Sequence, residues 1–309
     1  MVDQGEKYIN PLTDFGFKKL FGSEPNKDLL IDFLNQILPD RQISDLTYAS
    51  NEHFGSLESD RKAIFDIYCK GDDGERFIVE MQKAKQNYFK DRSVFYASFP
   101  IQEQAQKKAW DFKLEPVYSV GILDFVFEDH KQQDDLLHVV ELKNQQCEVF
   151  YDKLKFVYLE LPKFSKSADQ LETQFDKWLY VFTHLWKLQD RPAELRERVF
   201  EKLFEIAEIA KFSEEEREAY EESLKNYRDI KNVVDTAREE GLETGRLEGR
   251  IEGRLEGRIE GRLEGRIEGR LEGRLEEKLV IARRMRAQGL TDSDIQQFTG
   301  LSGEELEGL

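Results

Sequence analysis

Apolar and polar residues alternate along the first two thirds of the chain at spacings that predict a mixture of helices and strands. Two amphipathic helices are expected first, one capped by Thr13 or Asp14 and one over residues 26–38 that ends before Pro39. Residues 88–110 form a longer helical pattern, in which Pro100 predicts a break or kink. Strand patterns cover residues 46–54, 62–70, 76–82, 115–125, 136–144 and 153–161.

The pattern becomes helical again after these strands and divides the chain into four segments. Ser213 and Glu216 form a capping-box signature at the start of a long helix. Thr291 and Ser302 predict the caps of short helices near the end, in a tail that resembles a truncated helix-turn-helix motif with an acidic last helix. We expect an α/β core, an accessory helical layer, a long helix and a short helical tail, over residues 1–162, 163–212, 213–277 and 278–309.

A tetrapeptide repeat, Gly-Arg-Leu/Ile-Glu, runs through residues 245–275. On a straight helix its apolar stripe drifts by roughly 40° per repeat, a sense that favours right-handed supercoiling and excludes a leucine zipper. Each glycine costs a helix about 1 kcal/mol relative to alanine, and Glu/Arg pairs recover only about 0.2–0.5 kcal/mol apiece. We therefore expect a marginal helix that needs self-association, as a homo-oligomer, or a partner to persist.

Composition narrows the class of protein. The chain has 309 residues, enough for one large domain with extensions, and its 22 Phe and 11 Tyr gather before about residue 190. The two cysteines lack disulfide or zinc spacing, and no segment has the length of apolar sequence that a membrane span or a secretion signal needs. We expect a cytoplasmic protein with no membrane segment. The net charge of −17 argues mildly against non-specific nucleic-acid binding but does not exclude a nuclease.

The side chains most capable of catalysis or metal binding lie in the predicted hairpin of residues 62–70 and 76–82. Each strand carries one carboxylate among apolar residues, Asp66 in KAIFDIYCK and Glu80 in RFIVEMQ. If the loop is residues 71–75, the register sets Asp66 opposite Glu80, with Cβ atoms about 4.5–5.5 Å apart. Gln82 points to the same side because side chains alternate along a strand. Two carboxylates at this separation can share a divalent cation.

The pattern D-(x13)-E-x-Q, preceded by NPLTDFGFKKLFG and followed by RSVFYAS and VYSVGILDFVF, resembles the PD-(D/E)XK nuclease family transposases over residues 8–160. This group is also named recombination-promoting nucleases or putative transposases. The resemblance implies a restriction-endonuclease-like α/β core, with a mixed central sheet flanked by helices. It also implies that Asp66, Glu80 and the main-chain carbonyl of Met81 hold Mg²⁺, or Mn²⁺ in its place. Gln82 stands where most of the wider superfamily has lysine, and it would orient water or phosphate by hydrogen bonds.

The implied reaction is metal-dependent hydrolysis of DNA phosphodiester bonds, associated with recombination or mobile elements. Further candidates for the site or for DNA contact are Asp14, Glu52, Arg92, Tyr96 and Gln104.

Plainer interpretations stand beside these. Asp66 and Glu80 could be solvent-facing carboxylates of an edge strand, and Gln82 an ordinary strand end. Arg92, Tyr96 and Gln104 could instead have surface or core roles on their helix. The four histidines, which include His130 and His138, show no ligand spacing and are expected to be structural or exposed.

Three hypotheses follow for the whole protein. The first is a Mg²⁺-dependent DNA endonuclease. The second is a degenerate nuclease fold that binds DNA or a partner without cutting and that oligomerises through its helical repeat. The third is an oligomeric scaffold whose function resides in the repeat.

Overall fold

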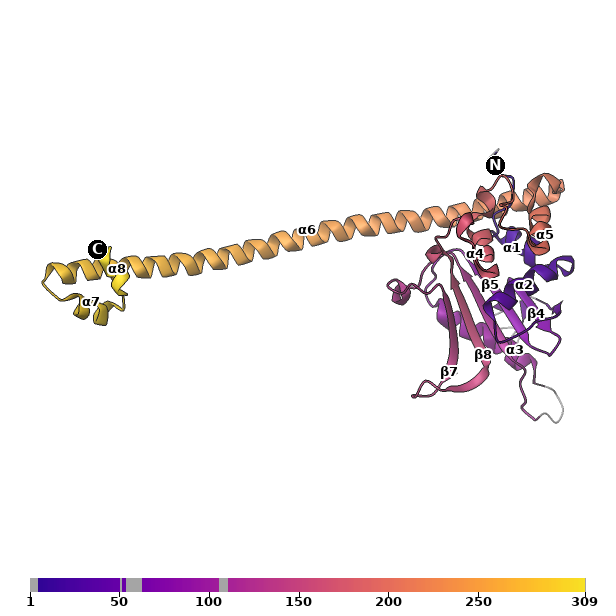
Figure 1. Cartoon of the computed structure of the whole chain (residues 1–309), viewed down its shortest axis with the longest axis horizontal. Helices are drawn as coiled ribbons and strands as arrows, with labels where there is room; N and C mark the ends of the chain where they lie inside the picture. Colours follow the sequence, from indigo (N-terminus) through magenta and orange to yellow (C-terminus); the bar gives the residue numbers. More distant parts are fainter. Residues whose placement is uncertain (1–4, 51, 54–62, 106–110, 309) are drawn as a thin grey trace. The chain divides into compact units, whose positions relative to one another are not determined.

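The computed structural model describes residues 5–50, 52–53, 63–105 and 111–308. The chain divides into two compact units, Met1–Asp235 and Thr236–Leu309 (Figure 1). The expected α/β core, the accessory helical layer and the first turns of the long helix all lie in the first unit. None of the helices in the described ranges is both long enough and apolar enough to cross a membrane.

A mixed six-stranded sheet forms the centre of the first unit, with strand order β1-β4-β5-β6-β8-β7. Strands β5, β6 and β8 are parallel, and the remaining pairs are antiparallel. A separate two-stranded sheet pairs β2 with β3. The strands are β1 (Leu46–Tyr48), β2 (Glu52–His53), β3 (Ala63–Ile64), β4 (Ile67–Gly71), β5 (Arg76–Gln82), β6 (Val117–Leu123), β7 (Leu137–Lys143) and β8 (Val149–Glu160).

Helices cover both faces of the sheet (Figure 1). The α-helices are α1 (Asp14–Phe21), α2 (Lys27–Ile37), α3 (Phe89–Glu103), α4 (Gln174–His184), α5 (Arg198–Ala207), α6 (Glu214–Ala287), α7 (Asp292–Thr299) and α8 (Gly303–Glu307). Short 3₁₀ helices are η1 (Glu24–Asn26), η2 (Glu128–His130), η3 (Leu161–Lys163), η4 (Ala168–Gln170), η5 (Leu185–Lys187) and η6 (Ile209–Lys211).

Two apolar layers hold these elements together. The larger core joins one face of the sheet to α1, α2, α4, α5 and the start of α6, with Trp178, Phe33 and Tyr220 fully buried. On the opposite face, α3 packs through Phe89 and Ala97. Strand β6 is buried along its whole length, as its apolar run predicted, because both of its faces are covered.

The hairpin differs from its prediction at one point. The expected strand 62–70 is interrupted at Asp66, so that Ala63–Ile64 pairs with β2 and β4 begins only at Ile67. The interruption has a local cause, because the Asp66 amide donates to the Glu80 side chain. The expected strand 46–54 is likewise divided into β1 and β2, and part of it lies outside the described residues.

Helix ends largely follow the sequence signals. Thr13 caps α1, Ser213 and Glu216 exchange the bonds of a capping box before α6, and Thr291 and Ser302 cap α7 and α8. Helix α3 contains Pro100 and ends at Glu103, earlier than expected.

In the second unit, the last turns of α6 pack with α7 and α8 around a small apolar core. Its buried residues are Ala282, Ile295, Leu301 and Leu306. Helix α6 runs without a break through the tetrapeptide repeat, and all eight of the Leu and Ile side chains of its ladder are between 39% and 61% exposed.

Candidate functional site

The β4–β5 hairpin has the register expected from its turn, with Lys70 paired to Arg76 and Ile67 paired to Val79. Continuing this register by one residue sets Asp66, just before β4, beside Glu80 in β5. The turn supports the register, because Gly74 has a φ of +85°, a left-handed conformation that glycine adopts without strain. The two carboxylates therefore come from adjacent segments of one hairpin.

Asp66 and Glu80 are linked through each other's backbone. The Asp66 amide donates to Glu80 Oε1 over 3.2 Å, and the Met81 amide donates to Asp66 Oδ2 over 2.8 Å. Each carboxylate is thus oriented by a backbone amide of the neighbouring segment, and the charge of Asp66 is felt at Glu80. This arrangement is compatible with both carboxylates ligating one cation.

Burial makes the negative charge of this pair costly. Burial, reinforced by the charge of Asp66, raises the pKa of Glu80 from 4.5 to about 8. Burial also raises the pKa of Asp66, while the amide of Met81 lowers it in part. Two buried carboxylates whose charges interact need a compensating positive charge, and a divalent cation with oxygen ligands meets that need.

Gln82 lies at the end of β5 on the same face as Glu80. Its Nε2 atom donates to Glu80 Oε2 over 3.4 Å. The amide therefore contacts a carboxylate that the sequence assigned to the metal, and it can orient that carboxylate. Met81 points to the opposite face, where its side chain is part of the larger core.

Arg92 and Tyr96 are one turn apart on α3, which packs on the face of the sheet that carries Glu80. Together with Glu80, Gly121 and Tyr158 they line a small cavity of about 10 Å³, which is room for about one water molecule. The guanidinium of Arg92 stands 5.3 Å from the Phe89 ring centre and 5.7 Å from that of Tyr96. Its Nη2 atom is buried and has no hydrogen-bond partner among the described residues. It is a donor available to an anionic ligand.

Asp14, at the start of α1, is close enough to Asp66 for its charge to be felt there. It pairs with Lys18 at 2.9 Å, and its charge contributes to the raised pKa of Asp66. Asp14, Lys18, Lys19 and Lys83 line an open groove of about 360 Å³ that reaches α6. Burial lowers the pKa of Lys83, although the carboxylates of Asp14 and Asp66 oppose that shift.

One further sequence candidate makes its contacts elsewhere. Gln104, at the end of α3, exchanges two hydrogen bonds with the backbone of Glu115, at 2.7 and 3.2 Å, and so fixes the chain before β6. Glu52 is in β2, paired with Ile64, and its side chain lies outside the described residues.

Sequence reasoning missed a second cluster of chemically capable side chains. His130, His138 and Glu160 come together at the end of β8, although they are eight and 22 residues apart in the chain. No local spacing marks this cluster, because its members come from the 3₁₀ helix η2 and from two strands.

Asp66, Glu80 and Gln82 thus lie together at the β4–β5 hairpin of a mixed sheet. No curated protein and no solved structure matches the chain at a significant level. A family model described as PD-(D/E)XK nuclease family transposase matches residues 11–237, which is nearly the whole of the first unit. Because that match spans well over half of the 309 residues, the chain belongs to the PD-(D/E)XK nuclease family of transposases.

Proposed function

We propose that the Met1–Asp235 unit is a Mg²⁺-dependent DNA endonuclease, with Mn²⁺ as a possible substitute, and that it acts in recombination or on mobile elements. The family supports a nuclease type of function. The observation that carries the finer proposal is the buried contact between Asp66 and Glu80, whose pKa values are both raised because their charge lacks solvation.

Asp66, Glu80 and the main-chain carbonyl of Met81 would hold the cation. When bound, Mg²⁺ supplies positive charge at the scissile phosphate and lowers the pKa of an attacking water. Gln82 keeps Glu80 in place through its amide and can also hydrogen-bond water or phosphate. The free Nη2 of Arg92, on the same side of the sheet as Glu80, can donate to a phosphate oxygen.

The groove beside Asp14 supports a nucleic-acid substrate. Lys18, Lys19 and Lys83 bring three cationic side chains to one opening, in a protein whose net charge is −17. Asp14 and Glu222 also line this opening, and Lys18 and Lys19 form ion pairs with Asp14 and Glu216. Lys83 therefore contributes the cation that has no carboxylate pair among the described residues. Positive charge clustered locally is what attracts a phosphate backbone, whatever the sign of the whole molecule.

The test is cleavage of supercoiled plasmid by the purified protein, with Mg²⁺, with Mn²⁺ and with a chelator. Asp66→Asn and Glu80→Gln each remove one carboxylate charge while keeping side-chain size. Asp72→Asn, in the turn of the same hairpin, removes an exposed charge and serves as the matched control. We expect nicking that needs the metal, persists in the control and disappears in both site variants.

Absence of cleavage by a folded wild-type protein in both metals would overturn the endonuclease. The second hypothesis would then replace it, a nuclease fold that binds DNA or a partner without cutting. Gln82 is the observation that favours this alternative, because glutamine supplies neither the cation nor the base that lysine would. DNA binding without cleavage, measured by electrophoretic mobility, would support it.

We further propose that the protein forms a homo-oligomer through the repeat of α6. Exposed Leu and Ile side chains at every fourth residue make an apolar ladder on this helix, and among the described residues nothing in the chain covers it. Solution mass before and after deletion of residues 245–275 tests the proposal, and an unchanged number of protomers would contradict it.

A further inference from the structure

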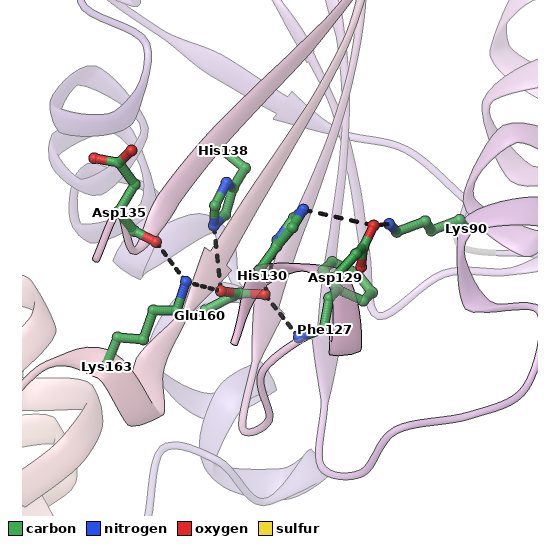
Figure 2. Close-up of polar contacts among 8 residues, drawn as sticks. All are labelled: Lys90, Phe127, Asp129, His130, Asp135, His138, Glu160 and Lys163. Atoms are coloured by element: carbon green, nitrogen blue, oxygen red, sulfur yellow. Dashed lines mark hydrogen bonds and ion pairs between the residues drawn. The ribbon is translucent and has the colours of Figure 1, made fainter. Parts of the chain in front are cut away.

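Glu160 ends strand β8 and is fully buried, although it carries a carboxylate. Two histidines converge on it from different elements, His130 from the end of η2 and His138 from β7 (Figure 2). The His130 Nδ1 atom lies 3.1 Å from Glu160 Oε1, and the His138 Nε2 atom lies 3.2 Å from Glu160 Oε2. The two rings stack with their centres 4.0 Å apart. Three ligand-type side chains thus meet at one point of the fold.

The kinds of donor atom at this point suit a transition metal. Two imidazole nitrogens and one carboxylate form a ligand set that zinc uses in proteins, with a fourth position left for water. Tetrahedral coordination with bonds of about 2.0–2.1 Å separates ligand atoms by about 3.3 Å. The two imidazole nitrogens lie 3.1 and 3.2 Å from different oxygens of Glu160, and one ligand atom from each of the three residues lies within 4.8 Å of the others. Rotation of the imidazole rings about their soft χ2 angle would bring them closer.

The surroundings of His130 add an independent indication. Its other ring nitrogen, Nε2, lies 4.0 Å from the carboxylate of Asp129. Lys90 of α3 holds that carboxylate through a 2.7 Å ion pair (Figure 2). At this distance the carboxylate is not hydrogen-bonded to the ring, but it lies on the side where a metal-binding histidine commonly has a carboxylate partner for its second nitrogen.

Glu160 already has one positive neighbour. The Lys163 ammonium lies 2.7 Å from Glu160 Oε2 and also donates to the Asp135 carbonyl. The Phe127 amide donates to Glu160 Oε1 over 2.8 Å. A metal ion at Glu160 must therefore displace or share the place of the ammonium, and Lys163 is a built-in competitor for the site.

We propose that His130, His138 and Glu160 form a second metal site, selective for a divalent transition metal such as Zn²⁺. The site is separate from Asp66 and Glu80, whose oxygen ligands suit Mg²⁺. In register, Gln82 is paired with Leu123 and Leu123 with Glu160, so Gln82 and Glu160 are two strands apart, about 10 Å, on one face of the sheet. The metal would tie the loop after β6 to the ends of β7 and β8.

The experiment titrates the full-length, chelator-stripped protein with Co²⁺, which reports tetrahedral nitrogen and oxygen coordination by its visible absorption. We expect one Co²⁺ per chain at this site, displaced by Zn²⁺ but not by excess Mg²⁺, and a melting temperature raised by Zn²⁺. The Asp66→Asn and Glu80→Gln variants should keep this signal, which separates the second site from the endonuclease proposal.

His138→Gln is the decisive variant, because the glutamine amide can still donate to Glu160 but is a poor ligand for these metals. It should keep the fold, as judged by its melting temperature without metal, and lose the Co²⁺ spectrum. His130→Gln provides the same test from the other ring if the first variant does not fold. Lys163→Met removes the competing ammonium and should tighten Co²⁺ binding.

The proposal is overturned by a wild-type protein that shows no tetrahedral Co²⁺ spectrum. A spectrum that His138→Gln and His130→Gln leave unchanged would also overturn it, since the ion would then lie elsewhere. Affinity that stays unchanged or falls in Lys163→Met would contradict the location of the ion at Glu160.

Discussion

At the scale of single residues, Glu80 combines burial with a charge that its closest neighbours do little to neutralise. The Asp66 amide and the Gln82 amide donate to it, but the nearby carboxylate of Asp66 raises its pKa further. A protein that only needed a stable hairpin would gain from an apolar residue here, because burying this carboxylate opposes folding. Burial of this carboxylate is explained if a bound cation takes the place of its proton during function.

The raised pKa of Glu80 predicts a pH dependence of stability in the metal-free protein. The folded state keeps the proton up to about pH 8, whereas the unfolded chain loses it near 4.5. The unfolded state therefore binds fewer protons between these values, and the free energy of unfolding falls as pH rises through the window. The slope for one proton is at most about 1.4 kcal/mol per pH unit.

Urea unfolding in the presence of a chelator, repeated across this pH range, measures that slope. Glu80→Gln should flatten it and should make the protein more stable than the wild type at the alkaline end. Equal slopes for the two proteins would mean that Glu80 is not the titrating group. Mg²⁺ should restore stability to the wild type at alkaline pH but not to the variant.

Gln82 gives a second prediction at this scale. Gln82→Ala removes the hydrogen bond that orients Glu80, while leaving the strand end and the two carboxylates in place. Loss of such an outer partner typically lowers metal affinity or activity by about 10–100-fold. Single-turnover plasmid cleavage measures the effect, with Gln145→Ala in the exposed loop between β7 and β8 as control. A rate equal to that of the control would assign Gln82 to the strand end alone.

At the scale of elements, the start of α6 is part of the nuclease unit and not a linker. Tyr220 is fully buried, and its hydroxyl accepts the Asn10 amide over 2.8 Å. The Ser223 hydroxyl accepts the Phe15 amide, and the Tyr227 hydroxyl donates to Asp124 next to the end of β6. Because the Asp124 amide donates to the Gln82 carbonyl, this helix is joined to the strand ends that carry the site.

Tyr220→Phe should therefore destabilise the first unit although it removes only one oxygen atom. The change leaves the buried backbone N–H of Asn10 without this acceptor, at a cost of about 1–3 kcal/mol in the free energy of unfolding. Tyr88→Phe, at a side chain that is 80% exposed, is the matched control. Urea unfolding midpoints measure both, and a Tyr220 variant as stable as the control would refute the structural role of this bond.

The elements also show what the sequence can and cannot predict. The register of β4 with β5 followed from the turn of residues 71–75, and the burial of β6 from its continuous apolar run. The break at Asp66 could not be foreseen, because it depends on a side-chain bond to Glu80 across the hairpin. The cluster around Glu160 was hidden for a similar reason, since its three members become neighbours only when β7 and β8 pair with the loop after β6.

At the scale of the whole molecule, the family match and the fold agree on where the nuclease unit ends. The match stops at residue 237 and the first compact unit at Asp235, both well inside α6. A chain of residues 1–235 should therefore fold and retain metal-dependent cleavage. A chain of residues 1–212 should not, because it lacks Tyr220, Leu224 and Tyr227 of the core. Thermal melting and plasmid cleavage of the two truncated proteins distinguish these outcomes, and loss of folding in the longer one would contradict the boundary.

In the repeat of α6, the glycines lower the stability of the helix, whereas the Leu and Ile ladder favours association. A Cβ added at any glycine of the repeat, Gly245 to Gly273, meets nothing within 4 Å, so alanine fits there without a clash. Replacing all eight glycines by alanine should raise the melting temperature of the helix, because each glycine costs about 1 kcal/mol. If the Leu and Ile ladder makes the oligomer, solution mass should stay the same in this variant and fall when the ladder residues become serine.

Dissociation of the alanine variant would instead indicate that the glycines themselves form the contact between helices. A glycine stripe that allows close approach between helices would be filled by the alanine side chains, and the oligomer would then dissociate although each helix became more stable. Circular dichroism and light scattering on the same samples separate helix stability from association. Because the ladder side chains are about half exposed in the single chain while the glycines present only bare backbone, the apolar contacts are the stronger driving force, and we expect the alanine variant to remain assembled.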